Sequence, residues 1–260
     1  MEQKLVLVTG SAKGIGRSIA LKLAEKGYDI IINSKSLRPD HNGETAHDVQ
    51  RLIEKMGRKA YLCIADISKP EGRQAILDCV DELGRLDILI NNAGIEPPPQ
   101  DVLEVTAEDL QLVLGTNFYG PFALTQQIAK RMIAWKSSGV IEQARIGFIT
   151  SIQADRVSAG IGYCISKVAI RNIVQQFAVR LGEADIPVVE FTPGVFLTSM
   201  SHKHVENITK QLQSGEWALN RRWGEMDEIG NLVASLADGI FDYSTGSVIP
   251  ISGGMNVFRL

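Results

Sequence analysis

Residues 5–16 read LVLVTGSAKGIG, an apolar run that leads directly into a turn with three glycines. The apolar run predicts a buried strand. Gly10, Gly14 and Gly16 would let the backbone approach a ligand closely, and a helix that opens there would direct free N–H groups and the positive end of its dipole at an anion. The spacing differs from the commoner dinucleotide-binding fingerprint but serves the same mechanics. This stretch therefore predicts a strand, a phosphate-binding turn and a helix.

The rest of the chain repeats the alternation of strands and amphipathic segments that builds a parallel sheet with helices on both faces. Right-handed crossovers would join the strands. The seven expected strands are residues 5–8, 29–32, 60–64, 88–90, 146–149, 188–191 and 248–251. Because no repeat, low-complexity tract or linker is visible, residues 1–260 are predicted to form a single-domain Rossmann fold with a doubly wound sheet. Its site would lie beyond the carboxyl ends of the strands.

Composition narrows the class of protein. Hydrophobic residues make up 45% of the 260 positions, and the formal charge of −3 gives no general attraction to nucleic acid or anionic membrane. No apolar run reaches membrane-spanning length, so we expect a cytoplasmic protein. The odd set Cys63, Cys79 and Cys164 does not suit a disulfide framework, and Cys164 is expected to pack rather than react. His202 and His204 lack the neighbours of a metal site, so no metal is predicted.

One pair of residues indicates proton-transfer chemistry. Tyr163 and Lys167 have the spacing that puts two side chains on one face of a helix. A free phenol has a pKa near 10, so a tyrosine acid that works near neutral pH needs that value lowered by about two to three units, roughly 3–4 kcal/mol. A lysine ammonium one turn away would supply part of this shift. Alone the pair is a weak signal, because the spacing also occurs on solvated helices.

Further motifs fall in a fixed order around this pair. Asn-Asn-Ala-Gly at 91–94 follows an expected strand, Asn117 lies in a later helix, and Thr-Ser at 150–151 ends another strand. With the glycine turn and the pair at 163 and 167, this order resembles the classical short-chain dehydrogenase/reductase family.

The resemblance covers essentially the whole chain. It extends to Asp66 after the third strand and to the segments 193–198 and 252–254. The segments 222–225 and 243–246 are most similar to proteins called 3-oxoacyl-(acyl-carrier-protein) reductases.

The resemblance implies a role for each catalytic candidate. Tyr163 would be the general acid that protonates a carbonyl oxygen during reduction, and the base in the reverse direction. Lys167 would lower the pKa of Tyr163 and hold the nicotinamide ribose. Ser151 would hydrogen-bond the substrate oxygen where negative charge develops. Asn117 would hold a water that links Lys167 to a proton relay.

The resemblance also assigns residues to a nicotinamide dinucleotide. The glycine turn would bind the pyrophosphate, Asp66 would meet the adenine and Asn92 would line the ribose side. Thr198 and the backbone at Phe196 would meet the nicotinamide end. The full expected set is Gly10, Ser11, Lys13, Gly14, Ile15, Gly16, Ser34, Lys35, Asp66, Ile67, Asn92, Ala93, Gly94, Tyr163, Lys167, Pro193, Gly194, Phe196 and Thr198.

The position of the serine departs from the usual family spacing. Ser151 stands one place closer to Tyr163 than the pattern has it, which we interpret as a one-residue deletion in the loop 158–162. Thr150 has the usual spacing and is the alternative. Ser151 is preferred because the second residue of such a pair normally faces the substrate.

The end of the second expected strand bears on the choice of cofactor. An acidic residue there would bind the ribose 2′-hydroxyl and repel a 2′-phosphate. The chain has Asn33-Ser34-Lys35 instead, and Asp29 lies at the opposite end of the strand. Lys35 and Lys13 would pair with a phosphate and Ser34 would hydrogen-bond it, although lysines are usually just solvated. We therefore expect NADP(H) in preference to NAD(H).

Substrate recognition is expected from the variable segments. Glu96 and Gln153 would bind substrate hydroxyls. The segment 199–223 is where the family carries a mobile lid, with Trp223 either on its substrate side or packing it onto the core. Residues 155–156 would contact substrate or form a surface pair of opposite charges.

Three functions stay open at this point. The first is the NADPH-dependent reduction of a 3-oxoacyl thioester, carried on an acyl carrier protein or CoA, to the 3-hydroxyacyl thioester. The second is the NAD(P)-dependent dehydrogenation of a sugar, polyol or other secondary alcohol, which Glu96 and Gln153 favour. The third is a dinucleotide-binding sensor without catalysis, which the intact catalytic set argues against.

The resemblance implies that the partners are a small carbonyl or alcohol substrate and further copies of the chain, in a homotetramer or homodimer. An acidic acyl carrier would need exposed basic residues, for which Lys130, Arg131 and Arg180 are candidates. Arg180 and Glu190 replace the glutamate and asparagine of many relatives, and nothing in the sequence explains either change. The apolar residues that would form an interface or pack within one subunit are Phe118, Phe122, Ile170 and Phe177.

Overall fold

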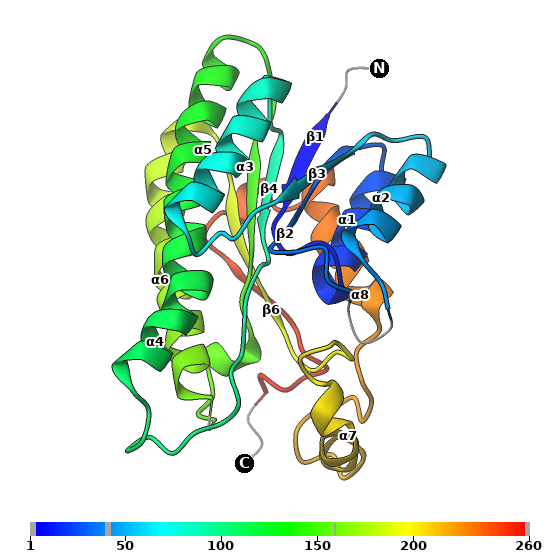
Figure 1. Ribbon diagram of the computed structural model, residues 1–260, viewed down its shortest axis with the longest axis vertical. Helices are drawn as coiled ribbons and strands as arrows, with labels where there is room; N and C mark the ends of the chain where they lie inside the picture. Colours follow the sequence, from blue (N-terminus) through cyan, green and yellow to red (C-terminus); the bar gives the residue numbers. More distant parts are fainter. Residues whose placement is uncertain (1–3, 40–42, 159, 258–260) are drawn as a thin grey trace.

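The computed structural model of the chain describes residues 4–39, 43–158 and 160–257. Its centre is a parallel sheet whose seven strands lie in the order β3-β2-β1-β4-β5-β6-β7 (Figure 1). The order reverses between β1 and β4, which confirms the predicted doubly wound Rossmann fold. The strands are β1 (Leu5–Val8), β2 (Asp29–Ser34), β3 (Ala60–Ile64), β4 (Ile88–Asn91), β5 (Arg145–Ile149), β6 (Val188–Pro193) and β7 (Val248–Ile251).

Helices cover both faces of this sheet. They are α1 (Gly14–Glu25), α2 (Ala46–Lys55), α3 (Pro70–Leu83), α4 (Ala107–Leu114), α5 (Gly120–Ser137), α6 (Ile161–Leu181), α7 (Val205–Gln213) and α8 (Met226–Ala234). α1, α2 and α8 lie on one face and α3, α5 and α6 on the other, while α4 and α7 stand near the carboxyl ends of the strands (Figure 1). No helix among the described residues is long and apolar enough to cross a membrane.

Four strands run past their predicted bounds. β2 continues through Ser34, β4 through Asn91 and β6 through Pro193, and β5 begins at Arg145. Asn91 still lies opposite Phe148 in the register of β4 and β5. Backbone hydrogen bonding continues where the side chains turn polar, and Asn33, Asn91 and Thr192 are buried like the apolar residues before them. The apolar pattern therefore ended these strands too early.

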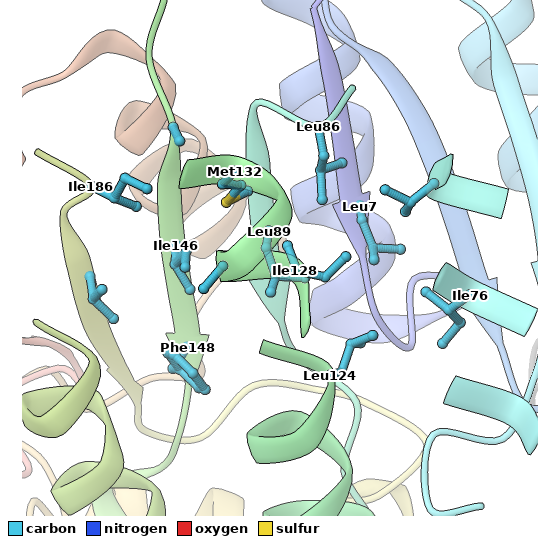
Figure 2. Packing of buried hydrophobic residues seen from close by; sticks show 14 of the residues in the cluster. Leu7, Ile76, Leu86, Leu89, Leu124, Ile128, Met132, Ile146, Phe148 and Ile186 are labelled. Carbon is cyan, nitrogen blue, oxygen red and sulfur yellow. The ribbon is translucent and has the colours of Figure 1, made fainter. Parts of the chain in front are cut away.

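The core forms an apolar layer on each face of the sheet. Figure 2 shows the layer under α3, α5 and α6, which contains Leu7 of β1, Leu89 of β4 and Ile146 of β5 together with Ile128 and Met132 of α5. All five side chains are 0% exposed. Burial of each contributes about 1.5–3 kcal/mol. The strands are therefore held firmly, and the loops at their carboxyl ends start from fixed points.

Candidate active site

The glycine turn joins β1 to α1 in a shape that fits a pyrophosphate. Gly10 and Gly14 have φ angles of +66° and +55°, in the left-handed region that favours glycine. A Cβ on Gly16 would come within 2.4 Å of both the Gly10 carbonyl oxygen and the Asn92 amide nitrogen. α1 has no side-chain cap and no acidic residue in its first turn, so its first N–H groups are available to an anion.

Neighbouring residues fix the turn in place. The Ser11 N–H donates to a carbonyl oxygen of β2 at 2.9 Å. The Asn92 amide donates to the carbonyl oxygens of Thr9 (2.9 Å) and Gly10 (3.2 Å). Ile15 packs against the core layer beneath α1. Asn92 thus acts on the turn itself, and its contact with a ribose stays a prediction.

The charged residues predicted for the adenosine end lie together. Lys35, just past β2, forms an ion pair of 2.9 Å with Asp66, which also accepts from the N–H (2.9 Å) and hydroxyl (2.7 Å) of Ser68. Burial opposes ionisation of Asp66, but the bonds from Ser68 and Lys35 outweigh it and lower the pKa of Asp66. Ser34 donates to a carbonyl oxygen of the following loop at 2.8 Å, and Ile67 is buried.

The predicted catalytic residues meet where β5 ends and α6 begins. Tyr163 and Lys167 are 9% and 5% exposed. The Lys167 ammonium lies 5.2 Å from the centroid of the Tyr163 ring and donates to the Ile149 carbonyl oxygen at 3.2 Å. Ser151, just past β5, is also buried and lowers the pKa of the Tyr163 phenol against the effect of burial. The fold therefore brings Ser151, Tyr163 and Lys167 into one buried site.

The electrostatics of the tyrosine differ from the prediction. Burial raises the pKa of Tyr163, the Glu96 carboxylate adds to the rise, and the Ser151 hydrogen bond offsets only part of it. Burial also lowers the pKa of Lys167 to about 8, against the opposing effects of Glu190 and Glu96. In the protein alone the net shift is therefore upward, because desolvation outweighs the effects that favour the phenolate. The lowering effect of Lys167 itself stays a prediction.

Thr150, the alternative to Ser151, is engaged elsewhere. Its hydroxyl donates to the Glu190 carboxylate at 2.6 Å and approaches the Phe191 carbonyl oxygen at 3.3 Å. Ser151 is therefore the hydroxyl that faces Tyr163. Ala159, inside the loop that we interpret as shortened, lies outside the described residues.

Asn117 lies in a π-helical turn, Gly115–Tyr119, between α4 and α5, where the sequence predicted a regular helix. Its Oδ1 accepts from the Ile95 N–H at 2.8 Å, and its amide donates to the Ile95 carbonyl oxygen (2.9 Å) and the Ser166 hydroxyl (3.1 Å). Such turns often occur at functional sites. Asn117 fixes the backbone that leads to Glu96, and its water-holding role stays a prediction.

The residues predicted for the nicotinamide end come from the loops after β4 and β6. A Cβ on Gly94 would lie 3.6 Å from the Lys167 ammonium, so this backbone borders the catalytic pair. A Cβ on Gly14 would lie 3.5 Å from the Thr198 methyl group, so Thr198 reaches the glycine turn. The Phe196 carbonyl oxygen accepts from a serine hydroxyl of the following segment at 2.7 Å.

A polar cluster lies beside Tyr163. The Gln153 amide nitrogen is 3.5 Å from Glu96 Oε1, and Gln153 Oε1 accepts from the Ser158 hydroxyl (3.0 Å) and the Cys164 thiol (3.5 Å). Burial raises the pKa of Glu96, and the Gln153 hydrogen bond opposes this. The sequence indicated Glu96 and Gln153 as contacts for substrate hydroxyls, but it gave no sign of Ser158. Cys164 was expected only to pack. Its hydrogen bonds were not predictable because they depend on how the turn after β5 folds over α6.

The segment 199–223 forms a small unit around α7. Trp223 donates its indole N–H to the Thr209 hydroxyl at 2.9 Å. It packs against an apolar cluster that includes Ile208 and Leu212 of α7. Of the two predicted alternatives, this geometry supports the one in which Trp223 packs the segment onto the core. A contact of Trp223 with substrate stays a prediction.

The surface pair that the sequence left open at 155–156, as the alternative to a contact with substrate, does not form. Asp155 pairs with Arg171 of α6, and Arg156 donates to the Met255 carbonyl oxygen. Within the described parts of the chain, no group of three or more His, Cys, Asp or Glu side chains is placed to hold a metal ion.

Comparison with known proteins gives matches over nearly the full length. A family model described as "Enoyl-(Acyl carrier protein) reductase" matches residues 10–256. The 3-oxoacyl-(acyl-carrier-protein) reductase FabG of Staphylococcus epidermidis is 30% identical over 254 residues, which cover 97% of this chain and 98% of the relative. A diacetyl reductase ((S)-acetoin forming) of the same species is 30% identical over 269 residues, which cover 98% and 99%. The crystal structure of a 3-oxoacyl-(acyl-carrier protein) reductase from Brucella melitensis in complex with NAD has a TM-score of 0.90 and 31% identity, over 100% of both chains.

Proposed function

This chain belongs to the short-chain dehydrogenase/reductase family, and on that premise we propose that Tyr163 is the acid and base with which it interconverts a carbonyl and an alcohol. Membership makes the protein an NAD(P)-dependent oxidoreductase that acts on CH–OH or C=O groups. The observation that carries the proposal is one buried site that holds Ser151, Tyr163 and Lys167, with the Lys167 ammonium 5.2 Å from the centroid of the Tyr163 ring. A dinucleotide-binding sensor would have no need of this arrangement.

Three side chains would divide the chemistry. When bound, the nicotinamide supplies or accepts the hydride. Tyr163 donates its phenolic proton to the carbonyl oxygen, and Ser151 donates a hydrogen bond to the same oxygen as negative charge develops there. Lys167, positively charged below about pH 8, stabilises the phenolate that remains. The raised pKa of Tyr163 keeps the phenol protonated in the free protein, which is the form that reduction requires.

NADP(H) is the proposed form of the cofactor, and the end of β2 supports it. β2 ends at Ser34, and its last three residues include no carboxylate. Lys35 follows, with a side chain that is 73% exposed. Lys13, just before α1, is also exposed. A 2′-phosphate would meet the Lys35 ammonium beside Asp66, and its larger negative charge would compete with that carboxylate for the lysine.

A 3-oxoacyl thioester is the first candidate substrate, because the FabG relative has that name and matches nearly the whole chain. An acidic carrier would need a basic patch on this protein. Lys130 and Arg180 are exposed. Arg131, however, already makes two hydrogen bonds to Asp81, at 2.6 and 2.7 Å. The patch available to a carrier is therefore weaker than the sequence predicted.

A sugar, polyol or other secondary alcohol is the second candidate, because of the polar cluster beside Tyr163. The carboxylate of Glu96 and the amide of Gln153 can accept from and donate to substrate hydroxyls. An acyl chain has no such groups and would leave the half-buried carboxylate with Gln153 as its partner and no substrate hydroxyl. The relative named diacetyl reductase also matches nearly the whole chain.

The test is turnover by the purified protein with NADPH or NADH and with acetoacetyl-CoA, diacetyl, or a panel of sugars and polyols. Wild type is compared with Tyr163→Phe and Glu96→Gln. Thioester turnover that is lost in Tyr163→Phe and kept in Glu96→Gln supports the first candidate. Polyol turnover that falls about tenfold or more in Glu96→Gln supports the second. Dinucleotide binding without turnover of any substrate would contradict the proposal and leave the sensor.

Assembly as a homodimer or homotetramer through α5 and α6 is also proposed. Of the predicted interface residues, Ile170 is 3% exposed, and Phe118 and Phe177 pack against the core of their own subunit. Phe122 is 38% exposed and Tyr119 nearby is 57% exposed, so apolar surface remains for a second copy. Sedimentation velocity would show a monomer if this surface has no partner.

All three cysteines are free, which supports a reducing compartment such as the cytoplasm.

A further inference from the structure

Glu190 is a carboxylate in the middle of β6 with 0% exposure. The Thr150 hydroxyl donates to Glu190 Oε1 at 2.6 Å. The Arg171 Nε of α6 lies 3.2 and 3.3 Å from the two carboxylate oxygens. An ionised carboxylate is tolerated in a core only where it is paired and hydrogen-bonded, and Glu190 meets both conditions.

The same guanidinium reaches a second acid. Arg171 pairs with Asp155 through both terminal nitrogens, the Nη2 bond measuring 3.1 Å. Thr150 and Asp155 are the two ends of the segment 150–155, which leaves β5 and turns toward α6. Glu190 therefore fixes this segment at both ends, directly at Thr150 and through Arg171 at Asp155. The catalytic hydroxyl lies between these two points.

The carboxylate also acts on the catalytic lysine. Lys167 stands one helical turn before Arg171 on the same face of α6. The charged and titratable groups around Lys167 are Glu190 from β6, Glu96 from the loop after β4, and Tyr163 and Arg171 from α6 itself. Burial lowers the pKa of Lys167, and the two glutamates oppose that effect. Without Glu190, Arg171 would keep only Asp155 as a partner, and the effect of burial on the pKa of Lys167 would be less opposed.

We propose that Glu190 is a positioning residue of the active site, which fixes the segment that carries Ser151. The inference rests on the proposed function, in which Ser151 acts on the substrate oxygen.

The test compares Glu190→Gln with Asp242→Asn. Glutamine keeps the shape of the side chain and an acceptor for Thr150 but removes the charge. Asp242→Asn breaks the part-buried Arg145–Asp242 pair (2.7 Å) at the opposite end of β5, so it is a control for the loss of an arginine–carboxylate pair away from the site. The readouts are the pH profiles of kcat and KM, amide hydrogen exchange over residues 150–155, and NMR titration of the Lys167 ammonium.

Glu190→Gln should lower kcat about tenfold with little change in the KM for the dinucleotide. It should also make the amides of 150–155 exchange faster and move the titration of Lys167, with the alkaline limb of the kcat profile, to lower pH. Asp242→Asn should lower the melting temperature and change none of these.

A Glu190→Gln protein that loses thermal stability like the control, but keeps the wild-type exchange rates, lysine titration and pH profile, would reduce Glu190 to a structural role and overturn the inference. Exchange and titration do not require turnover. A wild type that turned over no substrate would therefore refute the proposed function, while these two readouts would still decide on Glu190.

Discussion

Ser151→Ala removes one hydroxyl from the active site, and we expect it to lower kcat by about 100- to 1,000-fold. Loss of a single preorganised donor to a developing oxyanion costs ~2.7–4 kcal/mol, which corresponds to that range. Loss of the hydroxyl would also remove the effect with which Ser151 opposes burial and Glu96 at the pKa of the phenol. The hydroxyl accepts one bond of 3.2 Å from the Gln153 N–H, so the melting temperature should change little.

Thr150→Val is the matched control for this change. Its hydroxyl donates to the fully buried Glu190 at 2.6 Å. Removing that donor from a buried acceptor should cost about 1–3 kcal/mol of unfolding free energy, with a loss in kcat below about tenfold. Both variants are assayed for NADPH oxidation and for thermal unfolding. The reasoning would be refuted if Thr150→Val were about 100-fold slower than wild type while Ser151→Ala stayed active. Thr150 would then supply the catalytic hydroxyl.

Three further changes test the cofactor site and a helix cap. Gly16→Ala places a Cβ 2.4 Å from a backbone carbonyl oxygen, so NADPH should bind about tenfold more weakly or worse in a fluorescence titration. An affinity equal to that of wild type would show that the turn does not bind the pyrophosphate. Lys35→Ala should raise the KM for NADPH about tenfold and hardly change the KM for NADH. Equal effects on both KM values would mean that Lys35 only pairs with Asp66 and does not bind a 2′-phosphate. Hydrogen bonds from Thr45 lower the pKa of Asp48 from 3.8 to about 2, so the stability it contributes is complete above pH 3.8 and lost as the pH falls to 2. Unfolding of Asp48→Asn should depend less on pH in that window, and a pH dependence identical to wild type would contradict the assignment.

The fold was predictable because its signals are local. The apolar run and glycines of 5–16 determine a strand, a turn and a helix start within a few residues, and the later strands repeat the pattern. Tyr163 and Lys167 were predictable for the same reason, since helical spacing alone puts them on one face.

The properties that depend on the whole fold were not predictable. The direction of the pKa shift of Tyr163 is decided by how deeply α6 is buried, which no local pattern reports. The choice between Ser151 and Thr150 depends on Glu190, which lies 40 residues after Thr150 and on another strand. A lone acid in the apolar run of β6 does signal a buried partner, but the sequence does not say that the partner is Arg171.

The central claim is that Tyr163 transfers a proton while the dinucleotide transfers a hydride. The most direct measurement is the single-turnover rate of NADPH oxidation by wild type and Tyr163→Phe with a substrate that wild type reduces, alongside the affinity of both proteins for NADPH. The account predicts a rate at least about 100-fold lower in Tyr163→Phe with nearly unchanged affinity. Equal rates in the two proteins would contradict it.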